Sequence, residues 1–361
     1  MNYGIRRNRV DGFGLLELMI AMALGLIVVA GVIVIFLAQR QVYNNSSAQS
    51  LIQDSDNAIA AVIMPVVRGV GFMGCGAISN GVITYNASPP TPLTFNTNSA
   101  VQGYTGTMPS SLTDNAADDT SKGDWTPSLD KSIYTAGNGG PEKGSDVLVL
   151  IGAAPNASPI GVTTPIVGSP ITINDPTQLN AINGGGAQMV AVSDCVKSSV
   201  FQATGVSGNS VAYSAGPSNT PSYQANAQLI PVQQTMFFVA HGDGGQSALY
   251  EGVMTIPSGG TAAGASWTMS PIVPGVLAMK VLYGTGSNGT TTQYVDASAV
   301  SNWAQVTSIK LGFLVEGGLG SASIPSSPWS YTLFGKTISV PADSRMRHVF
   351  YMTVNTRNST L

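Results

Sequence analysis

The strongest pattern in the chain is a run of apolar residues close to the N-terminus. Between Leu18 and Ala38 lie 21 consecutive residues without a charged side chain. A helix of that length is about 31 Å long, close to the hydrocarbon thickness of a bilayer. Three basic residues precede the run, Arg6, Arg7 and Arg9, and positive charge favours the cytoplasmic side of a membrane. The pattern predicts one membrane-spanning helix with its N-terminus in the cytoplasm.

Beyond residue 38 the apolar periodicity continues in an amphipathic form. Apolar side chains recur three or four positions apart, while polar residues such as Asp54, Asp56 and Asn57 face elsewhere. The apolar positions are Leu51, Ile52, Ile59, Val62, Ile63 and Val66. We therefore expect one long helix from about Phe13 to about Val67, whose second half lies on a globular domain.

The rest of the chain carries the signature of strands. A short apolar run occupies 146–151, and apolar and polar residues alternate with a period of two over 307–316 and 345–354. A small helix is expected around 297–303. No helical patterns of 10–15 residues separate the strands, which argues against a doubly wound parallel sheet. The predicted fold class is α+β, with a long N-terminal helix packed on an antiparallel β-sheet domain.

Composition narrows the function classes. Charged residues make up 9% of the 361 residues, with 15 Lys+Arg, 18 Asp+Glu and a formal net charge of -3, against about 25% in ordinary globular proteins. This excludes a charged disordered chain, a coiled coil and a basic nucleic-acid scaffold. Apolar residues reach 43%, enough for a core. A Gly-rich, charge-poor chain of this kind is typical of an exported β-domain, and the alternative states of Cys75 and Cys195 are one disulfide or two unpaired thiols.

Two motifs suggest ligands but lack the required context. Gly284–Gly289 satisfies GxGxxG, yet the β-prone residues 290–294 follow where a dinucleotide site needs a helix. A hairpin loop is expected there. An acidic cluster lacks the spacing of a calcium-binding loop and predicts a solvated loop; its members are Asp114, Asp118, Asp119 and Asp124.

The two histidines do not suggest catalysis. His241 precedes the glycine-rich turn 242–245, and His348 lies on the apolar phase of the last strand, where we expect a buried core residue. The sequence has no credible nucleophile–base pair, no paired carboxylates in a motif and no metal-ligand spacing of Cys and His. It predicts a protein that is not an enzyme and has no cofactor or metal.

One carboxylate stands at the edge of the apolar run. Glu17 directly precedes Leu18, and a charge within a span costs on the order of 2.5–3.5 kcal/mol at mid-bilayer and less near the interface. The segment Gly12–Leu18 resembles the type IV prepilin signature, departing from it only at Gly14, where Thr or Ser is usual. The resemblance implies cleavage between Gly12 and Phe13 by the prepilin peptidase, N-methylation of Phe13, and pairing of Glu17 with the α-amino group of a neighbouring subunit. The alternative is a signal anchor with a chance glutamate.

Segments along most of the chain resemble the PilW family of type IV minor pilins. They begin with an Arg-x-x-Gly-aromatic-x-Gly-Cys segment directly after the helix and continue in order to a closing strand with a terminal Arg-Asn; residues 80–145 show no resemblance and suggest a variable loop. The blocks are 68–75, 193–202, 236–250, 276–306 and 345–358.

The resemblance implies a function and a set of partners. It implies a structural minor pilin in a tip complex that primes pilus assembly and supports twitching motility and adhesion. The implied partners are other minor pilins, the major pilin, the prepilin peptidase, the inner-membrane assembly platform and a tip adhesin; nucleic acid is not expected. The alternatives are a J-type pseudopilin of type II secretion and, from another class, a membrane-anchored periplasmic hydrolase.

The same resemblance divides the chain. Residues 1–12 are expected to be the leader peptide, 13–38 the transmembrane half of the helix, 39–68 its amphipathic half, and 69–361 a periplasmic and later extracellular β-rich domain. A Cys75–Cys195 bridge would close a loop of 120 positions and add roughly 4–5 kcal/mol of stability in the chain-entropy model. It would tie the end of the helix to the middle of the domain.

Overall fold

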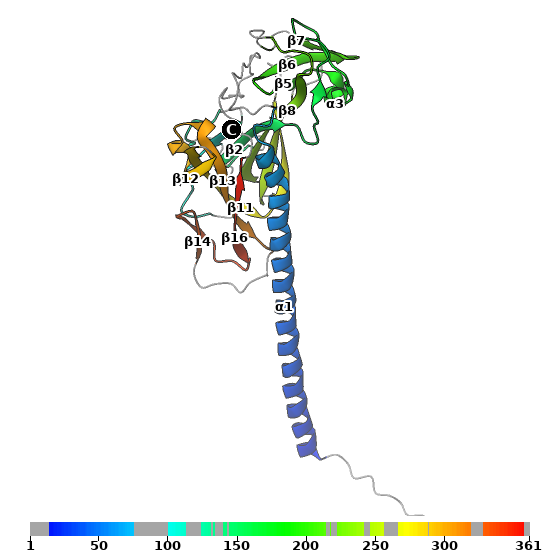
Figure 1. Cartoon of the computed structure of the whole chain (residues 1–361). Coiled ribbons are helices and arrows are strands. Elements are labelled where there is room, and N and C mark those ends of the chain that lie inside the picture. The colour runs from blue at the N-terminus through cyan, green and yellow to red at the C-terminus, as the bar shows by residue number, and fades with distance from the viewer. Residues whose placement is uncertain are drawn as a thin grey trace, which may run out of the picture.

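The apolar and amphipathic halves of the N-terminal segment form one continuous helix, α1 (Leu15–Gly69). Figure 1 shows the first half of α1 projecting alone from a β-rich domain that covers the second half. The computed structural model describes residues 14–75, 100–112, 124–130, 133, 140–142, 144–213, 217, 222–241, 246–255, 266–287, 289–318 and 328–356.

The largest sheet has ten strands with antiparallel pairing throughout. Its main path is β1-β2-β8-β5-β6-β7-β4; β3 and β9 also pair with β8, and β10 pairs with β9. The strands are β1 (Val101–Tyr104), β2 (Val147–Ala153), β3 (Ile160–Gly161), β4 (Ile171–Thr172), β5 (Gln188–Ser193), β6 (Ser198–Ser207), β7 (Ser210–Tyr213), β8 (Gln228–His241), β9 (Ser247–Thr255) and β10 (Ser266–Pro274).

A second sheet of four antiparallel strands has the order β12-β11-β13-β16. Its strands are β11 (Val276–Ser287), β12 (Thr290–Val295), β13 (Val306–Glu316) and β16 (Arg347–Asn355), and a separate hairpin joins β14 (Trp329–Leu333) to β15 (Lys336–Val340). The α+β fold class is confirmed, as are the strands expected over 146–151, 307–316 and 345–354. The small helix expected near 297–303 is two 3₁₀ turns, Ala297–Ala299 and Trp303–Gln305.

The core that positions α1 lies between the helix and both sheets. The helix buries one face, formed by Ala48, Ile52, Ile59, Ile63 and Val67. Of these, Ile59, Ile63 and Val67 meet apolar side chains of β2, β8, β11, β13 and β16 in one cluster. The expectation for Leu51 was wrong: its side chain is 53% exposed. The buried face follows Ala48, Ile52, Ile59, Ile63 and Val67, and Leu51 lies to the side of it.

A smaller lobe with its own core lies at the end of the domain farthest from the N-terminus of α1 (Figure 1). It comprises β3 to β7, the short helix α3 (Thr177–Ala181) and the first residues of β8. Strand β8 spans 14 residues; its start pairs with β3 and β5, and its remainder pairs with β2 and β9. Strand β8 therefore joins the lobe to the rest of the ten-stranded sheet.

The end of α1 approaches the main sheet closely at a glycine. Val70 forms an antiparallel bridge with Gly152 of β2, and the Gly71 amide donates to the Ile151 carbonyl at 2.9 Å. A Cβ atom added at Gly152 would lie 2.6 Å from the carbonyl oxygen of Gly69. The end of the helix can lie this close to β2 because residue 152 has no side chain.

Replacing Gly152 by alanine should force the helix end away from β2. We expect Gly152→Ala to lower the free energy of unfolding by about 1–3 kcal/mol, the usual cost of overpacking. Denaturant unfolding of the detergent-solubilised protein, followed by circular dichroism, measures it. Gly168→Ala is the control, because no atom lies within 4 Å of its added Cβ; equal stability of the two variants would contradict the close approach.

Candidate functional site

The first half of α1 presents a bare apolar surface. Its large side chains are more than half exposed along the whole stretch from Leu15 to Leu37. The helix is long and apolar enough to cross a membrane. Contiguous apolar surface of this size marks a membrane or protein interface. Gly12 and Phe13, the predicted cleavage site, lie outside the described residues.

Glu17 lies in the first turn of α1. Its side chain is exposed, and it is the only charged residue between Phe13 and Arg40. The unpaired backbone amides at a helix N-terminus favour a nearby negative charge. The carboxylate therefore stands at the start of the apolar surface, where an amino group of another chain can reach it.

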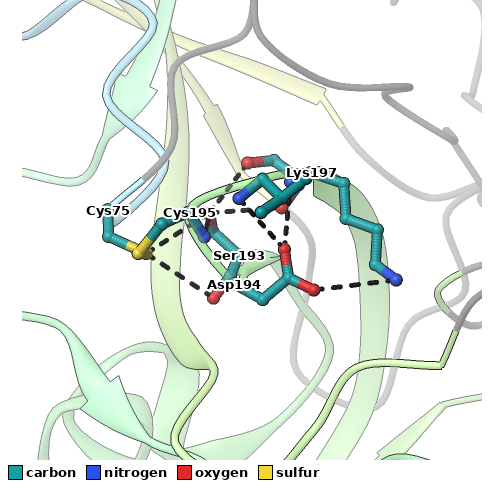
Figure 2. Close-up of a disulfide and its surroundings, with 7 residues drawn as sticks. Cys75, Ser193, Asp194, Cys195 and Lys197 are labelled. Atoms are coloured by element: carbon teal, nitrogen blue, oxygen red, sulfur yellow. Dashed lines mark hydrogen bonds and ion pairs between the residues drawn. A yellow bond between two sulfur atoms is a disulfide. The ribbon is translucent and has the colours of Figure 1, made fainter.

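The second half of α1 is tied covalently to the domain. Cys75, just beyond the helix, forms a disulfide with Cys195, with 4.7 Å between their Cα atoms and 120 positions between them in sequence. Figure 2 shows the bridge beside the turn that joins β5 to β6. The disulfide expected between these residues is present, and the alternative of two unpaired thiols was wrong.

Local hydrogen bonds shape the turn that carries Cys195. Asp194 Oδ1 accepts from the amides of Val196 and Lys197 at 3.2 and 3.0 Å (Figure 2). The Lys197 ammonium lies 3.6 Å from Asp194 Oδ2 and 4.6 Å from the centroid of the Tyr223 ring. Cys195 has a φ of 69°, a left-handed conformation that costs energy in a residue with a Cβ and that the surrounding turn must hold. The hydrogen bonds of this turn thus fix the position of the Cys195 sulfur that forms the disulfide.

A buried ion cluster joins three segments of the domain. Lys280 of β11 lies 3.1 Å from Asp146 and 2.9 Å from Asp296, and the side chains of Lys280 and Asp146 are both 2% exposed. The Asp146 carboxylate also accepts from the backbone amides of Val281 at 2.8 Å and Gly106 at 3.0 Å. Burial raises the pKa of Asp146 to about 6, although Lys280 and the two amides oppose the shift. The cluster fixes β11 against the start of β2.

Sequence reasoning missed this cluster. The one available signal was Lys280, a single charge within the apolar segment Val276–Tyr283. A lone buried charge needs a partner, but nothing in the sequence pairs residue 280 with residue 146. Only the folded sheet brings the two side chains together.

Acidic and basic residues also gather where β13 ends and β16 begins. Arg347 donates to both carboxylate oxygens of Asp343 at 2.7 and 2.6 Å and lies 3.2 Å from Glu316. Arg345 donates to Glu316 at 2.5 Å. This network holds the segment before β16 against the end of β13. Sequence alternation alone had placed both arginines on the polar side of a strand.

The expectation of a core position for His348 was wrong. The residue lies on the same face of β16 as the buried Met352 and Val354, but its side chain is 55% exposed. It lies near the start of the strand, and its Nε2 is 3.8 Å from Asp56 of α1. His348 therefore lies at the boundary between helix and sheet.

The remaining residues singled out from the sequence are the glycine-rich motif, His241 and the acidic cluster. The glycine-rich motif 284–289 covers the end of β11 and the turn to β12, in a hairpin as expected; Asn288 lies outside the described residues. His241 Nδ1 contacts the Glu142 carboxylate. Of the acidic cluster, Asp114, Asp118 and Asp119 lie outside the described residues. Among the residues that are described, no group of three or more His, Cys, Asp or Glu side chains could hold a metal ion.

Removing the disulfide should destabilise the domain. We expect Cys75→Ser with Cys195→Ser to lower the free energy of unfolding by about 4–5 kcal/mol, because the unfolded chain gains the freedom of a 120-position loop. Denaturant unfolding under non-reducing conditions measures the loss. Val196→Ser is a control in the same turn, with a side chain that is 75% exposed. A double-serine variant as stable as this control would refute a stabilising role of the bridge.

The buried carboxyl predicts a pH dependence of stability. Asp146 has a pKa of about 6 when folded, against an ordinary value of 3.8, so between about pH 4 and 6 the folded state binds this proton more tightly than the unfolded state. This group therefore makes the fold less stable as the pH rises through that window. We expect Asp146→Asn, which cannot titrate, to lose less stability than the unsubstituted protein between pH 4 and 6.5. Thermal melting at both pH values measures the difference, and parallel profiles would contradict the assignment.

Two family models match parts of the chain, one near the N-terminus and one in the C-terminal third. A family model described as Type IV Pilus-assembly protein W matches residues 236–358, and one described as the Prokaryotic N-terminal methylation motif matches residues 7–33. The first match extends from the middle of β8 beyond β16. The second includes Gly12, Phe13 and Glu17.

One solved structure is similar, a type IV-like pilin from Thermus thermophilus. It is 21% identical over 51% of this chain and 91% of that chain, with a TM-score of 0.22, too low to support the fold. No curated protein sequence matches the chain. Residues 236–358 are therefore similar to the PilW family of type IV pilus-assembly proteins, and residues 7–33 carry a prepilin-type methylation motif.

Proposed function

We propose that this protein is a structural minor pilin that joins a minor-pilin tip complex, primes assembly of the pilus and supports twitching motility and adhesion. The observation that carries the proposal is the division of α1. Its first half is apolar and uncovered with a single carboxylate, Glu17, at its start, and its second half is fixed to the domain. A helix of this kind can move from a membrane into a bundle of similar helices without unfolding the domain.

The proposed pathway begins in the inner membrane. Residues 1–12 are the leader, cut by the prepilin peptidase between Gly12 and Phe13, after which the α-amino group of Phe13 is methylated. Residues 13–38 hold the subunit in the membrane with the C-terminal domain in the periplasm. The assembly platform then moves the subunit into the extracellular pilus, the fimbrium, where residues 39–68 continue the helix into the domain.

Glu17 supplies the proposed docking contact. An amine and a carboxylate attract more strongly in a low-dielectric environment than in water, and either charge left alone there is costly. The Glu17 carboxylate of an incoming subunit would therefore favour the position in which it meets the Phe13 amine of a subunit already assembled. The exposed apolar side chains of the first half of α1 would contact lipid before assembly and neighbouring helices afterwards. This exchange would cost little free energy, since lipid tails are themselves apolar.

The attachment of α1 suits a subunit that is pulled by its helix. The apolar face from Ala48 to Val67, the close approach at Gly152 and the Cys75–Cys195 bridge all join α1 to the sheets. A force on the helix would be carried by packing, backbone hydrogen bonds and a covalent bond together. Other minor pilins and the major pilin are the partners that such a helix would contact.

The lobe of β3 to β7 supports a position at the tip. It lies beyond the end of α1, on the side of the domain away from the membrane (Figure 1). Subunits within a filament stack head to tail, and each must leave room for the next. A lobe on the distal side fits a subunit with few neighbours above it, and it offers a surface to a tip adhesin.

Two experiments separate the minor pilin from the two alternatives. A J-type pseudopilin would share the processed N-terminus, but deleting it would impair export of enzymes and leave twitching and surface pili intact. A membrane-anchored hydrolase would keep residues 1–12, so N-terminal sequencing of the membrane form would not begin at methylated Phe13. Loss of twitching and pili, with a processed N-terminus, supports the minor pilin.

The docking role of Glu17 can be tested by an isosteric change. We expect Glu17→Gln, which keeps size but removes charge, to reduce surface pili at least tenfold while processing at Gly12 continues. Electron microscopy and sheared-pilus blots measure assembly, and mass spectrometry measures processing. Gln39→Glu is the control: it alters the charge by one unit at the far end of the apolar run, away from the proposed docking contact. Normal piliation with Glu17→Gln would exclude the charge role.

A further inference from the structure

The main sheet divides at the middle of β8. Strands β2 and β3 lie on one side of β8, and β5 and β9 share the other. Pairing with β5 ends at Pro231, and pairing with β9 begins at Thr235. Among the described residues, no strand pairs with Val232–Gln234 on this side. We call this opening between β5 and β9 the fork.

Each strand at the fork has residues that extend past its pairing with β8. On β5 these are Gln188 and Met189, which pair only with β6; on β9 they are Met254 and Thr255, which pair only with β10. With Val232–Gln234 they line a cavity of about 520 Å³. That volume is within the range of about 300–1,000 Å³ typical of ligand sites.

A second cavity continues the first toward the helix. Its volume is about 270 Å³, and it shares Ala154, Pro155 and Gln233 with the fork. Its other walls include Pro65 and Gly69 at the end of α1. The two cavities therefore adjoin at these three residues.

Two side chains that line the fork carry an unused hydrogen-bond acceptor. Gln188 and Gln234 are 4% and 5% exposed, and the amide oxygen of each has no hydrogen-bond partner among the described residues. The orientation of Gln188 is fixed, because its Nε2 donates to the Leu179 carbonyl at 3.0 Å. An unsatisfied buried acceptor costs about 1–3 kcal/mol. An occupant whose N–H groups donated to these two amide oxygens would remove that cost.

The lining determines the chemistry of the occupant. It contains no charged and no aromatic residue, and its apolar part includes Met189, Val232, Val253 and Met254. The absence of charge disfavours an ionic ligand. The absence of aromatic side chains removes the flat apolar surfaces on which sugar rings commonly stack. Methionine side chains adapt their shape to a variable apolar partner.

We propose that the fork is a docking site for an extended, uncharged peptide segment of a partner protein. Three residues of β8 span about 10 Å, enough for three or four residues of an incoming strand. Main-chain groups of that strand would meet the strand ends, its N–H groups would donate to Gln188 and Gln234, and small apolar side chains would occupy the cavity. This is strand addition at an interrupted position within a sheet, with affinity from the main chain and specificity from side-chain pockets.

The test uses the processed full-length protein in lipid nanodiscs and a defined probe. The probe is a pool of capped hexapeptides randomised over Ala, Val, Ser, Thr, Asn and Gly, and bound peptides are counted by mass spectrometry. We expect at least tenfold enrichment over empty nanodiscs. A matched pool with N-methylated backbone amides and a pool with central Lys or Asp should not be enriched.

Two substitutions locate the binding. Met254→Trp should abolish enrichment by filling the fork, and Gln234→Met, which keeps volume but removes the acceptor, should weaken binding about tenfold. Val167→Trp adds the same bulk at a side chain that is 82% exposed outside the fork and should bind as the unsubstituted protein does. Thermal melting verifies folding; if Met254→Trp does not fold, Gln234→Met carries the test.

Several results would overturn the proposal. They are no enrichment of the uncharged pool, equal enrichment on Gln234→Met, or equal enrichment of the N-methylated or charged pools. Retention of neutral oligosaccharides in place of peptides would assign the fork to a different class of ligand. Because binding is measured without pili, its failure is distinguishable from a failure of the proposed pilus function.

Discussion

Packing of the second half of α1 against the sheets is the constraint on which the other features depend. Ile59, Ile63 and Val67 are fully buried, and they meet residues from both sheets in one core. The helix therefore determines how the ten-stranded and four-stranded sheets lie relative to each other. It also determines the direction in which the uncovered apolar half projects. A change that loosened this packing would alter the domain and the orientation of the proposed assembly surface together.

Polar groups reinforce the same arrangement from outside the apolar core. Lys280 and Asp146 join the two sheets through a buried ion pair, and the disulfide joins the segment after α1 to the β5–β6 turn. Buried ion pairs contribute more to the definition of one structure than to net stability, since desolvation offsets much of their attraction. The apolar packing thus supplies most of the stabilisation, and the polar contacts and the covalent bond specify which segments meet.

Much of this could be predicted from sequence, because the signals were local. The apolar run and its amphipathic continuation predicted α1 to within two residues at each end, and alternation predicted β13 and β16. His348 shows the limit: its phase was right, but burial depends on whether another element covers that point of the strand. The lobe was missed because β3 and β4 have only two residues each and the longer β5 and β6 contain several Ser and Ala residues. The fork was beyond prediction, since it arises from where two strands distant in sequence stop pairing with a third.

The disulfide also has a mechanical consequence. Any pull that enters through α1 reaches Cys75 and can pass directly to Cys195, so the 120 positions between them are not part of the loaded path. If fully extended, a chain of that length would add roughly 400 Å. The bridge keeps this length out of the contour of the molecule even if the non-covalent contacts of the domain were to fail. A subunit built in this way can lose structure between these two cysteines under load without lengthening by that segment.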